Sequence, residues 1–137
     1  MDRRARLVFL ALIVVQAAHS IEEYTFRLYE VFTPARLASG LVSSDLATGF
    51  AILNGSLVGF GVWCYLARVR TGARSARAWV WPWVVVELGN GIGHPALAIA
   101  RGGYFPGVAT APVLLALALY LAADLVRDRQ SSPTAAV

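Results

Sequence analysis

Four long apolar segments, separated by short polar stretches, follow one another along the chain. They extend over residues 7–30, 46–66, 79–100 and 108–125. A helix that crosses a bilayer needs about 20 mostly apolar residues, so four crossings occupy almost the whole chain. The pattern predicts an all-α fold with one domain, residues 1–126, built as an integral-membrane four-helix bundle. A disordered polar tail is predicted for residues 127–137.

Local signals mark the ends of these segments. No Gly or Pro interrupts the first segment before Pro34, which predicts one continuous helix to about Val31. The stretch that follows, up to residue 45, is predicted to be a loop, with Ser44 or Asp45 as the cap of the second helix. The Gly- and Pro-rich residues 101–107 predict a turn before the fourth helix.

Composition supports a membrane protein. The chain of 137 residues is 58% hydrophobic and 15% charged, and its mean hydropathy is +0.61. The net charge of +4 comes with arginines at the ends of apolar segments rather than on one face, which argues against nucleic acid as a partner. Cys64 is the only cysteine, so neither an intramolecular disulfide nor a thiolate metal cluster is expected.

The distribution of arginines predicts the orientation. The N-terminus holds three, the 68–77 loop four and the C-terminal tail two, against three elsewhere. The positive-inside rule then places both termini, and the tail, in the cytoplasm of a multi-pass inner (plasma) membrane protein. The apolar N-terminal segment is interpreted as an uncleaved anchor rather than a secretory signal. Trp79 and Trp81 fit an aromatic belt at the cytoplasmic interface.

Glycines in the second segment predict helix packing. Gly55 and Gly59, with Gly61 nearby, have the small-xxx-small spacing that lets a neighbouring helix approach closely. This spacing is common in membrane helices and carries no functional meaning here.

Polar residues gather at one depth of the predicted bundle. In the first helix, a broad face carries Gln16, His19, Glu22, Glu23, Phe26 and Glu30. With a rise of about 1.5 Å per residue, the polar groups of three helices come to the same level, roughly 16 to 22 Å from the cytoplasmic ends. The predicted catalytic site consists of His19, Glu22, Glu23, Asn54, Glu87, Asn90 and His94.

The third helix has a further irregularity within this layer. Pro95 cannot donate a hydrogen bond to the carbonyl of Gly91, and it disfavours helical geometry at His94. The helix is therefore expected to kink or open there and to line a cavity.

Two structural explanations compete with a site. Glu22 and Glu23 would simply mark the outer interface if the first helix leaves the membrane early. Alternatively, a His–Glu network ties the first helix to the third without doing chemistry. Glu87 lies closer to the cytoplasmic end and is interpreted as a residue that orients His94 or Asn90.

The run His19-Ser-Ile-Glu22-Glu23 matches the defining pattern of a known family, and the chain resembles the HXXEE family of small bacterial membrane proteins. Two later runs, Asn90-Gly-Ile-Gly-His94 and Tyr104-Phe-Pro106-Gly107, also resemble that family. The likeness extends from the first helix to the start of the fourth. It implies a site at the pattern residues without assigning them an activity.

The first functional hypothesis is an isomerase or terpene-type cyclase that acts on an isoprenoid or other lipid substrate from the bilayer. A carboxyl in an apolar pocket stays protonated and acts as a general acid, a role assigned to Glu22 or Glu23. Aromatic side chains are then expected to stabilise positive charge; the candidates are Phe26, Phe50, Trp63 and Trp83. This chemistry needs no cofactor.

Two alternatives remain open. The first is a metal-dependent membrane enzyme in which His19, Glu22, Glu23 and His94 bind zinc or iron. The second is a non-catalytic lipid-binding protein or proton-linked carrier, which in a chain this short is expected to dimerise. Membrane lipids are partners under every hypothesis, and formation of a homo-oligomer is left open.

Overall fold

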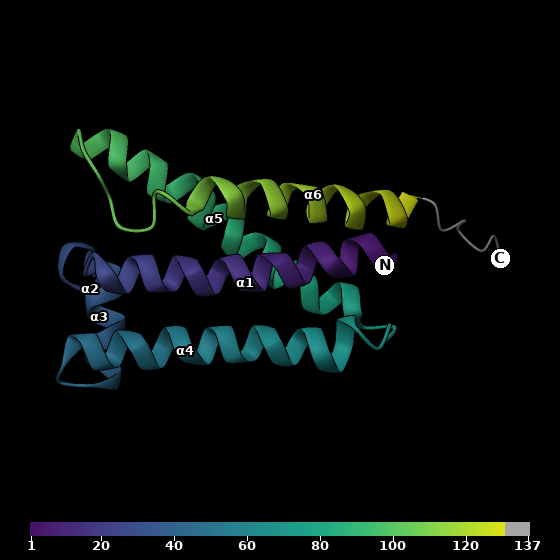
Figure 1. Ribbon diagram of the computed structural model, residues 1–137, viewed down its shortest axis with the longest axis horizontal. Coiled ribbons are helices and arrows are strands. Elements are labelled where there is room, and N and C mark those ends of the chain that lie inside the picture. The colour runs from purple at the N-terminus through teal and green to yellow at the C-terminus, as the bar shows by residue number, and fades with distance from the viewer. Residues whose placement is uncertain (131–137) are drawn as a thin grey trace.

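The structure is a computed structural model that describes residues 1–130. Within this range the chain is all-helical, without a strand (Figure 1). In chain order the helices are α1 (Arg3–Thr25), α2 (Leu28–Val31), α3 (Thr33–Val42), α4 (Leu46–Cys64), the π-helical turn η1 (Tyr65–Val69), α5 (Ala76–Arg101) and α6 (Ala111–Gln130).

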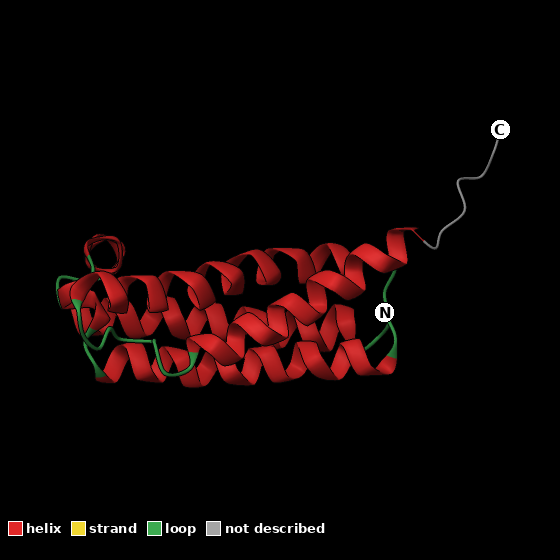
Figure 2. Ribbon diagram, turned by 90° about the horizontal axis from the view of Figure 1, so that it is seen from above, coloured by secondary structure: helices red, strands yellow, loops and turns green. Residues whose placement is uncertain are grey.

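Four long helices alternate in direction along a common axis (Figures 1 and 2). The beginnings of α1 and α5 and the ends of η1 and α6 lie together at one end, which we call the terminal end. The short helices α2 and α3 lie at the opposite end, which we call the α3 end, where α3 crosses between α1 and α4. The up-and-down arrangement therefore agrees with the order of the predicted segments.

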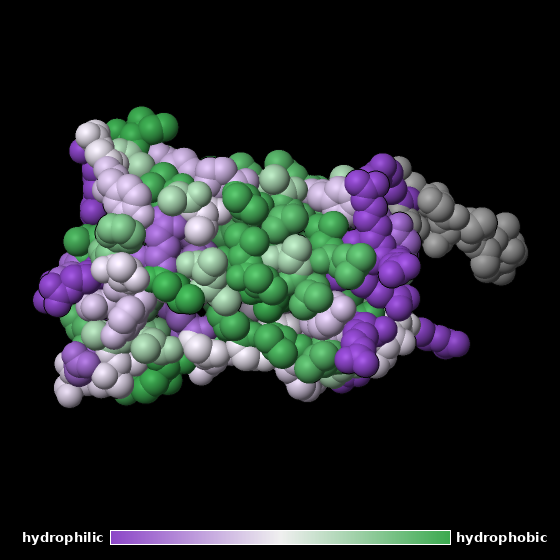
Figure 3. All heavy atoms as spheres, viewed as in Figure 1, coloured by the Kyte–Doolittle hydropathy of each residue, from purple (hydrophilic) through white to green (hydrophobic). Residues whose placement is uncertain are grey.

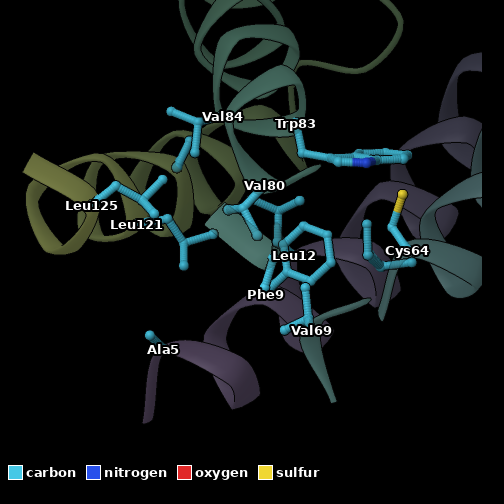
Figure 4. Packing of buried hydrophobic residues seen from close by; sticks show 13 residues of the cluster. Ala5, Phe9, Leu12, Cys64, Val69, Val80, Trp83, Val84, Leu121 and Leu125 are labelled. Carbon is cyan, nitrogen blue, oxygen red and sulfur yellow. The ribbon is translucent and has the colours of Figure 1, made fainter. Parts of the chain in front are cut away.

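The larger of two apolar core clusters lies in the half of the bundle nearer the terminal end, and its side chains are shown in Figure 4. Phe9 and Leu12 of α1 meet Trp83 of α5 and Leu121 of α6, and all four side chains are almost completely buried. Burial of side chains of this size contributes about 1.5–3 kcal/mol each, so this packing holds the α1–α5–α6 contact together.

Close helix approach depends on Gly91 and Gly61 rather than on the pair Gly55 and Gly59. A Cβ atom on Gly91 of α5 would lie 2.5 Å from Leu115 Cβ of α6, and one on Gly61 would lie 2.7 Å from Ile13 Cδ1. At Gly55 and Gly59, a Cβ atom would meet nothing within 4 Å. The expected packing of another helix on these two glycines is thus wrong for the described chain, because they lie on an open face of α4.

The first predicted helix is too long. α1 ends at Thr25, and Arg27 adopts a left-handed conformation with φ of 56°. This conformation turns the chain away, so residues 28–30 belong to α2. The predicted loop that follows contains helix α3, because Pro34 lies in the first turn of α3, where a missing N–H costs nothing.

Other boundaries agree more closely with expectation. Asp45 caps α4, since its side chain accepts a hydrogen bond from the Thr48 amide at 3.0 Å. Helix α5 does not open at Pro95 but continues to Arg101, because a single missing hydrogen bond is absorbed by the intact turns on either side. Helix α6 extends to Gln130, past the predicted start of the tail at 127. The rest of that tail, 131–137, lies outside the described residues.

Two helical segments, Arg3–Thr25 and Leu46–Val69, are long and apolar enough to cross a membrane. On the face shown in Figure 3, apolar side chains cover the middle of the bundle and hydrophilic ones gather towards its two ends. Length, composition and surface pattern are therefore all compatible with a membrane protein.

Candidate metal centre

Three buried side chains from two helices converge on one point. The Glu23 Oε1 atom lies 3.3 Å from Nε2 of His19, one turn earlier in α1, and 3.3 Å from Nε2 of His94 in α5. The two imidazole rings are nearly perpendicular, with centroids 4.7 Å apart. His19 is 0% exposed, and Glu23 and His94 are each 7% exposed. The three groups therefore form a compact cluster shielded from solvent.

The opposite nitrogen of each imidazole is held by an oxygen atom of the α5–α6 loop. His94 Nδ1 lies 2.6 Å from the backbone carbonyl of Pro106, which can only accept, so Nδ1 carries the proton. His19 Nδ1 lies 2.7 Å from Thr110 Oγ1. The single Thr110 hydroxyl proton goes to Glu22 Oε2 at 2.6 Å, so this hydroxyl accepts from His19 Nδ1. Each ring thus carries a proton on Nδ1 and turns its Nε2 atom towards Glu23, and in the neutral form of the ring that Nε2 atom presents a lone pair.

With both imidazoles neutral, this arrangement collects three acceptor groups at one point. Two neutral Nε2 atoms and a carboxylate are all acceptors, and His19 Nε2 is fully buried without a hydrogen-bond partner. The ligand atoms all lie within 4.8 Å of one another. A tetrahedral ion with bonds of about 2.1 Å separates its ligand atoms by about 3.4 Å, close to the two observed distances of 3.3 Å. The cluster is therefore of the right chemistry and size for a metal ion.

Glu22 is part of a clamp on the α5–α6 loop. Its Oε1 accepts hydrogen bonds from the Tyr104 hydroxyl at 2.5 Å and the Ala109 amide at 2.9 Å. Its Oε2 accepts from the amide and the hydroxyl of Thr110 at 3.0 and 2.6 Å. Burial, together with the Glu22 carboxylate, raises the pKa of Tyr104, so its hydroxyl remains a donor at neutral pH. Glu22 thus fixes the loop that orients both histidines.

The Thr110 hydroxyl links this clamp to His19, which makes Thr110→Val a test. Valine keeps the shape of threonine but leaves His19 Nδ1 without its partner. Loss of such a partner of a metal-binding histidine lowers metal affinity by about 10- to 100-fold, and a buried unsatisfied donor lowers the free energy of unfolding by about 1–3 kcal/mol. Zinc titration and thermal unfolding measure the two effects.

Thr25→Val is the matched control. The Thr25 hydroxyl bonds only the carbonyl of Ile21 and is exposed, so neither quantity is expected to change appreciably. Full zinc affinity in Thr110→Val would show that the hydroxyl does not orient His19.

The predicted polar residues outside the cluster form a hydrogen-bonded chain deeper in the bundle. Ser20 donates to Asn54 Oδ1 at 2.9 Å, which joins α1 to α4. Asn90 Nδ2 donates to Glu87 Oε2 at 3.1 Å. With its amide nitrogen turned towards Glu87, Gln16 donates to both carboxylate oxygens at 3.0 Å. Glu87 is 0% exposed, so these donors compensate for the burial of its carboxyl group.

A cleft of about 260 Å³ reaches the cluster from between α1, α3, α4 and α5. Glu23 and His94 lie in its lining together with the carboxamides of Gln16, Asn54 and Asn90. Of the four aromatic residues predicted to face a cation, only Phe50 lines this cleft. The cluster is thus buried but not sealed.

The other predicted aromatic residues lie elsewhere. Trp83 packs on Phe9 in the core, and Trp63 packs against Phe60 and Trp79. Phe26 is 52% exposed and contacts Tyr104. Their predicted involvement at the site has no support in the geometry, because they lie outside the cleft lining.

The structure brings the predicted residues together unequally. His19, Glu23 and His94 meet directly, whereas Glu22 turns to the loop and Asn54, Asn90 and Glu87 form the neighbouring hydrogen bonds. Glu30, predicted on the same helix face, is in α2 and pairs with Arg27 at 3.1 Å. Sequence reasoning missed Thr110 and the carbonyl of Pro106. The run Tyr104-Phe-Pro106-Gly107, which resembles the family, could have indicated that this loop belongs to the site. Nothing in the sequence marked Thr110.

The family model of proteins of unknown function with an HXXEE motif matches residues 10–121, more than half of the chain. This chain belongs to the HXXEE family. In this HXXEE protein, the His and the second Glu of the motif are members of the metal-sized cluster, and the first Glu holds the loop. No curated protein and no solved structure matches the chain.

Proposed function

We propose that this HXXEE protein is a multi-pass membrane enzyme that binds a catalytic divalent metal ion and acts on a hydrophobic substrate from the bilayer. His19, Glu23 and His94 are the ligands, with zinc as the first candidate and iron as the alternative. The convergence of two Nδ1-anchored imidazoles on one buried carboxylate carries the proposal. It favours the metal hypothesis over the others derived from the sequence.

The composition of the ligand set favours catalysis over a structural role. Structural zinc sites are closed by four protein ligands, mostly cysteines, whereas catalytic sites keep three protein ligands and one open position. Two histidines and one carboxylate form such a three-ligand set, and the same set suits non-haem iron. The cleft supplies access to the open position. An ion held by His19, Glu23 and His94 would supply Lewis acidity at this end of the cleft.

Helix lengths support four membrane crossings. Besides the two most apolar segments, α5 has 26 residues and α6 has 20, which correspond to about 39 and 30 Å. A hydrocarbon core is about 30 Å thick, so both suffice. Polar residues of the site, such as Glu87 and His94, lower the hydropathy of α5. The arginines of the terminal end support a cytoplasmic position for that end and for both termini, with the bundle in the inner membrane, because loops rich in Lys and Arg stay in the cytoplasm.

One observation favours acid–base chemistry as the second candidate. Glu23 touches both imidazoles, so the same three groups can hold a shared proton next to an apolar cleft. Under that hypothesis, the protein is an isomerase or cyclase of an isoprenoid-like lipid without a metal. Glu22 is a poor choice of acid in either case, because its two oxygens already accept four hydrogen bonds.

Metal analysis separates the two candidates. Wild-type protein and His94→Ala are purified in detergent, incubated with zinc or iron(II), desalted and measured by elemental analysis. We expect about one ion per chain in the wild type and less than about a tenth of that in His94→Ala, because three ligands are reduced to two. The chain has two histidines in all, and both belong to the cluster, so an imidazole-bound ion lies here.

Circular dichroism and size-exclusion chromatography check that His94→Ala is folded. Wild-type protein that retains neither zinc nor iron would overturn the metal proposal and leave the acid–base candidate. Equal metal content in the two proteins would place the ion elsewhere.

A further inference from the structure

The cleft at the metal centre divides into a polar end and an apolar remainder. The polar groups of its lining are Glu23, His94 and the carboxamides of Gln16, Asn54 and Asn90. Most of the remaining lining is aliphatic or aromatic, contributed by α3, α4 and α5 as well as the start of α2. An occupant that satisfies both parts has a small polar group joined to a hydrocarbon portion.

The mouth of the cleft lies between α4 and α5. Leu53 of α4 and Val86 of α5 both line the cleft, yet they are 36% and 41% exposed. They therefore form its rim. Two apolar side chains at the middle of two bilayer-spanning helices face hydrocarbon, so the cleft opens sideways into the bilayer and not towards water.

The size of the cleft limits what it encloses. Sites that surround a whole drug-sized ligand measure about 300–1,000 Å³, and this cleft measures about 260 Å³. It has room for the reacting end of a molecule with one hydrocarbon chain and not for a lipid with two hydrocarbon chains. The rest of such a molecule remains between α4 and α5 or in the bilayer.

Asn90 indicates the chemistry of the polar group. Its Nδ2 donates to Glu87, while its side-chain oxygen accepts no hydrogen bond from the described residues. An acceptor beside a metal ion suits a ligand whose metal-binding oxygen adjoins an O–H or N–H donor. Acyl amides and acyl hydroxamates have this pair of groups.

We infer that the cleft binds the polar end of a single-chain amphiphile, with an oxygen atom on the metal, a donor on Asn90 and its chain between Leu53 and Val86. This inference rests on the proposed function, because the metal is one of the contacts. It names the substrate class of that site.

Octanohydroxamate and acetohydroxamate, which differ only in chain length, serve as the probes. Their binding to zinc-loaded protein in nanodiscs is measured by calorimetry. We expect Leu53→Trp to weaken octanohydroxamate binding by about tenfold or more, because the indole fills the rim and displaces several methylenes. Acetohydroxamate affinity and zinc affinity are expected to stay within about twofold. Val86→Trp, from the opposite rim, should have the same effect.

Leu119→Trp is the matched control, since Leu119 lies on α6, is 54% exposed and lines no part of the cleft. It should change neither affinity. Unaltered zinc binding in the rim variants shows that they are folded. If zinc binds and Leu53→Trp and Val86→Trp change the affinities of the two hydroxamates equally, the proposed binding of the hydrocarbon chain between Leu53 and Val86 is wrong, while the metal centre stands. If the wild type binds no metal, both proposals fail.

Discussion

Glu23→Gln is expected to lower the zinc affinity of the protein by more than about 100-fold while leaving its fold intact. Glutamine has the shape of glutamate but lacks the negative charge, so the ion loses its anionic ligand and keeps two neutral imidazoles. Changes to groups that merely orient a ligand already cost about 10- to 100-fold, and removal of the ligand itself costs more. Zinc titration against a chromophoric chelator measures the change.

The fold should tolerate this substitution for a specific reason. In the metal-free state the new carboxamide is able to donate to an imidazole Nε2, which replaces a cluster of acceptors by a hydrogen bond. Glu30→Gln is the control, because Glu30 has an exposed side chain and forms an ion pair with Arg27, three residues earlier, outside the cluster. Zinc affinity in Glu23→Gln within a few-fold of that in Glu30→Gln would contradict the assignment of Glu23 as a ligand.

Gly107→Ala is expected to have the largest effect on stability. Gly107 has φ of 92°, and a Cβ atom there would lie 2.6 Å from His94 Nδ1 and 2.7 Å from His19 Cε1. The conformation costs an L-residue about 1–2 kcal/mol, and overpacking against the two rings adds about 1–3 kcal/mol. The free energy of unfolding should therefore fall by about 2–5 kcal/mol. Zinc binding should be lost as well, because the rings are pushed apart.

Gly102→Ala separates the two causes. Gly102 also has a positive φ, of 67°, but a Cβ atom there meets nothing within 4 Å. It shares the conformational cost without the collision, so we expect a loss of about 1–2 kcal/mol and normal zinc binding. Thermal unfolding and zinc titration of both variants make the comparison. Equal effects in the two would mean that Gly107 does not shape the metal centre.

Much of the bundle was predictable, because apolar runs of bilayer length joined by short segments allow few arrangements of the helices. The level of the polar layer was predictable too, since a fixed rise per residue brings His19 and His94 to the same depth. The turn after Thr25 was not, because it depends on a left-handed conformation at Arg27, a residue that does not normally mark such a turn. Helix α3 was mistaken for a loop because Pro34 normally interrupts a helix, whereas here it lies in the first turn of α3.

The separate roles of the two glutamates could not be predicted from periodicity. Glu22 and Glu23 are 100° apart on α1, so a broad helical face includes both. Which one meets His94 depends on the rotation of α1 against α5, and packing at the core sets that rotation. The hydrogen bonds of Thr110 and of the Pro106 carbonyl depend on how the α5–α6 loop folds back over α1, and a backbone carbonyl has no signature in the sequence.

The X-ray absorption spectrum of the zinc-loaded wild-type protein tests the central claim most directly. We predict a four-coordinate ion with nitrogen and oxygen ligands at about 2.0–2.2 Å and with scattering from two imidazoles, those of His19 and His94. Two results would contradict it. One is a sulfur ligand at about 2.3 Å, which would point to Cys64, the single cysteine of the chain. The other is a spectrum without scattering from two imidazoles.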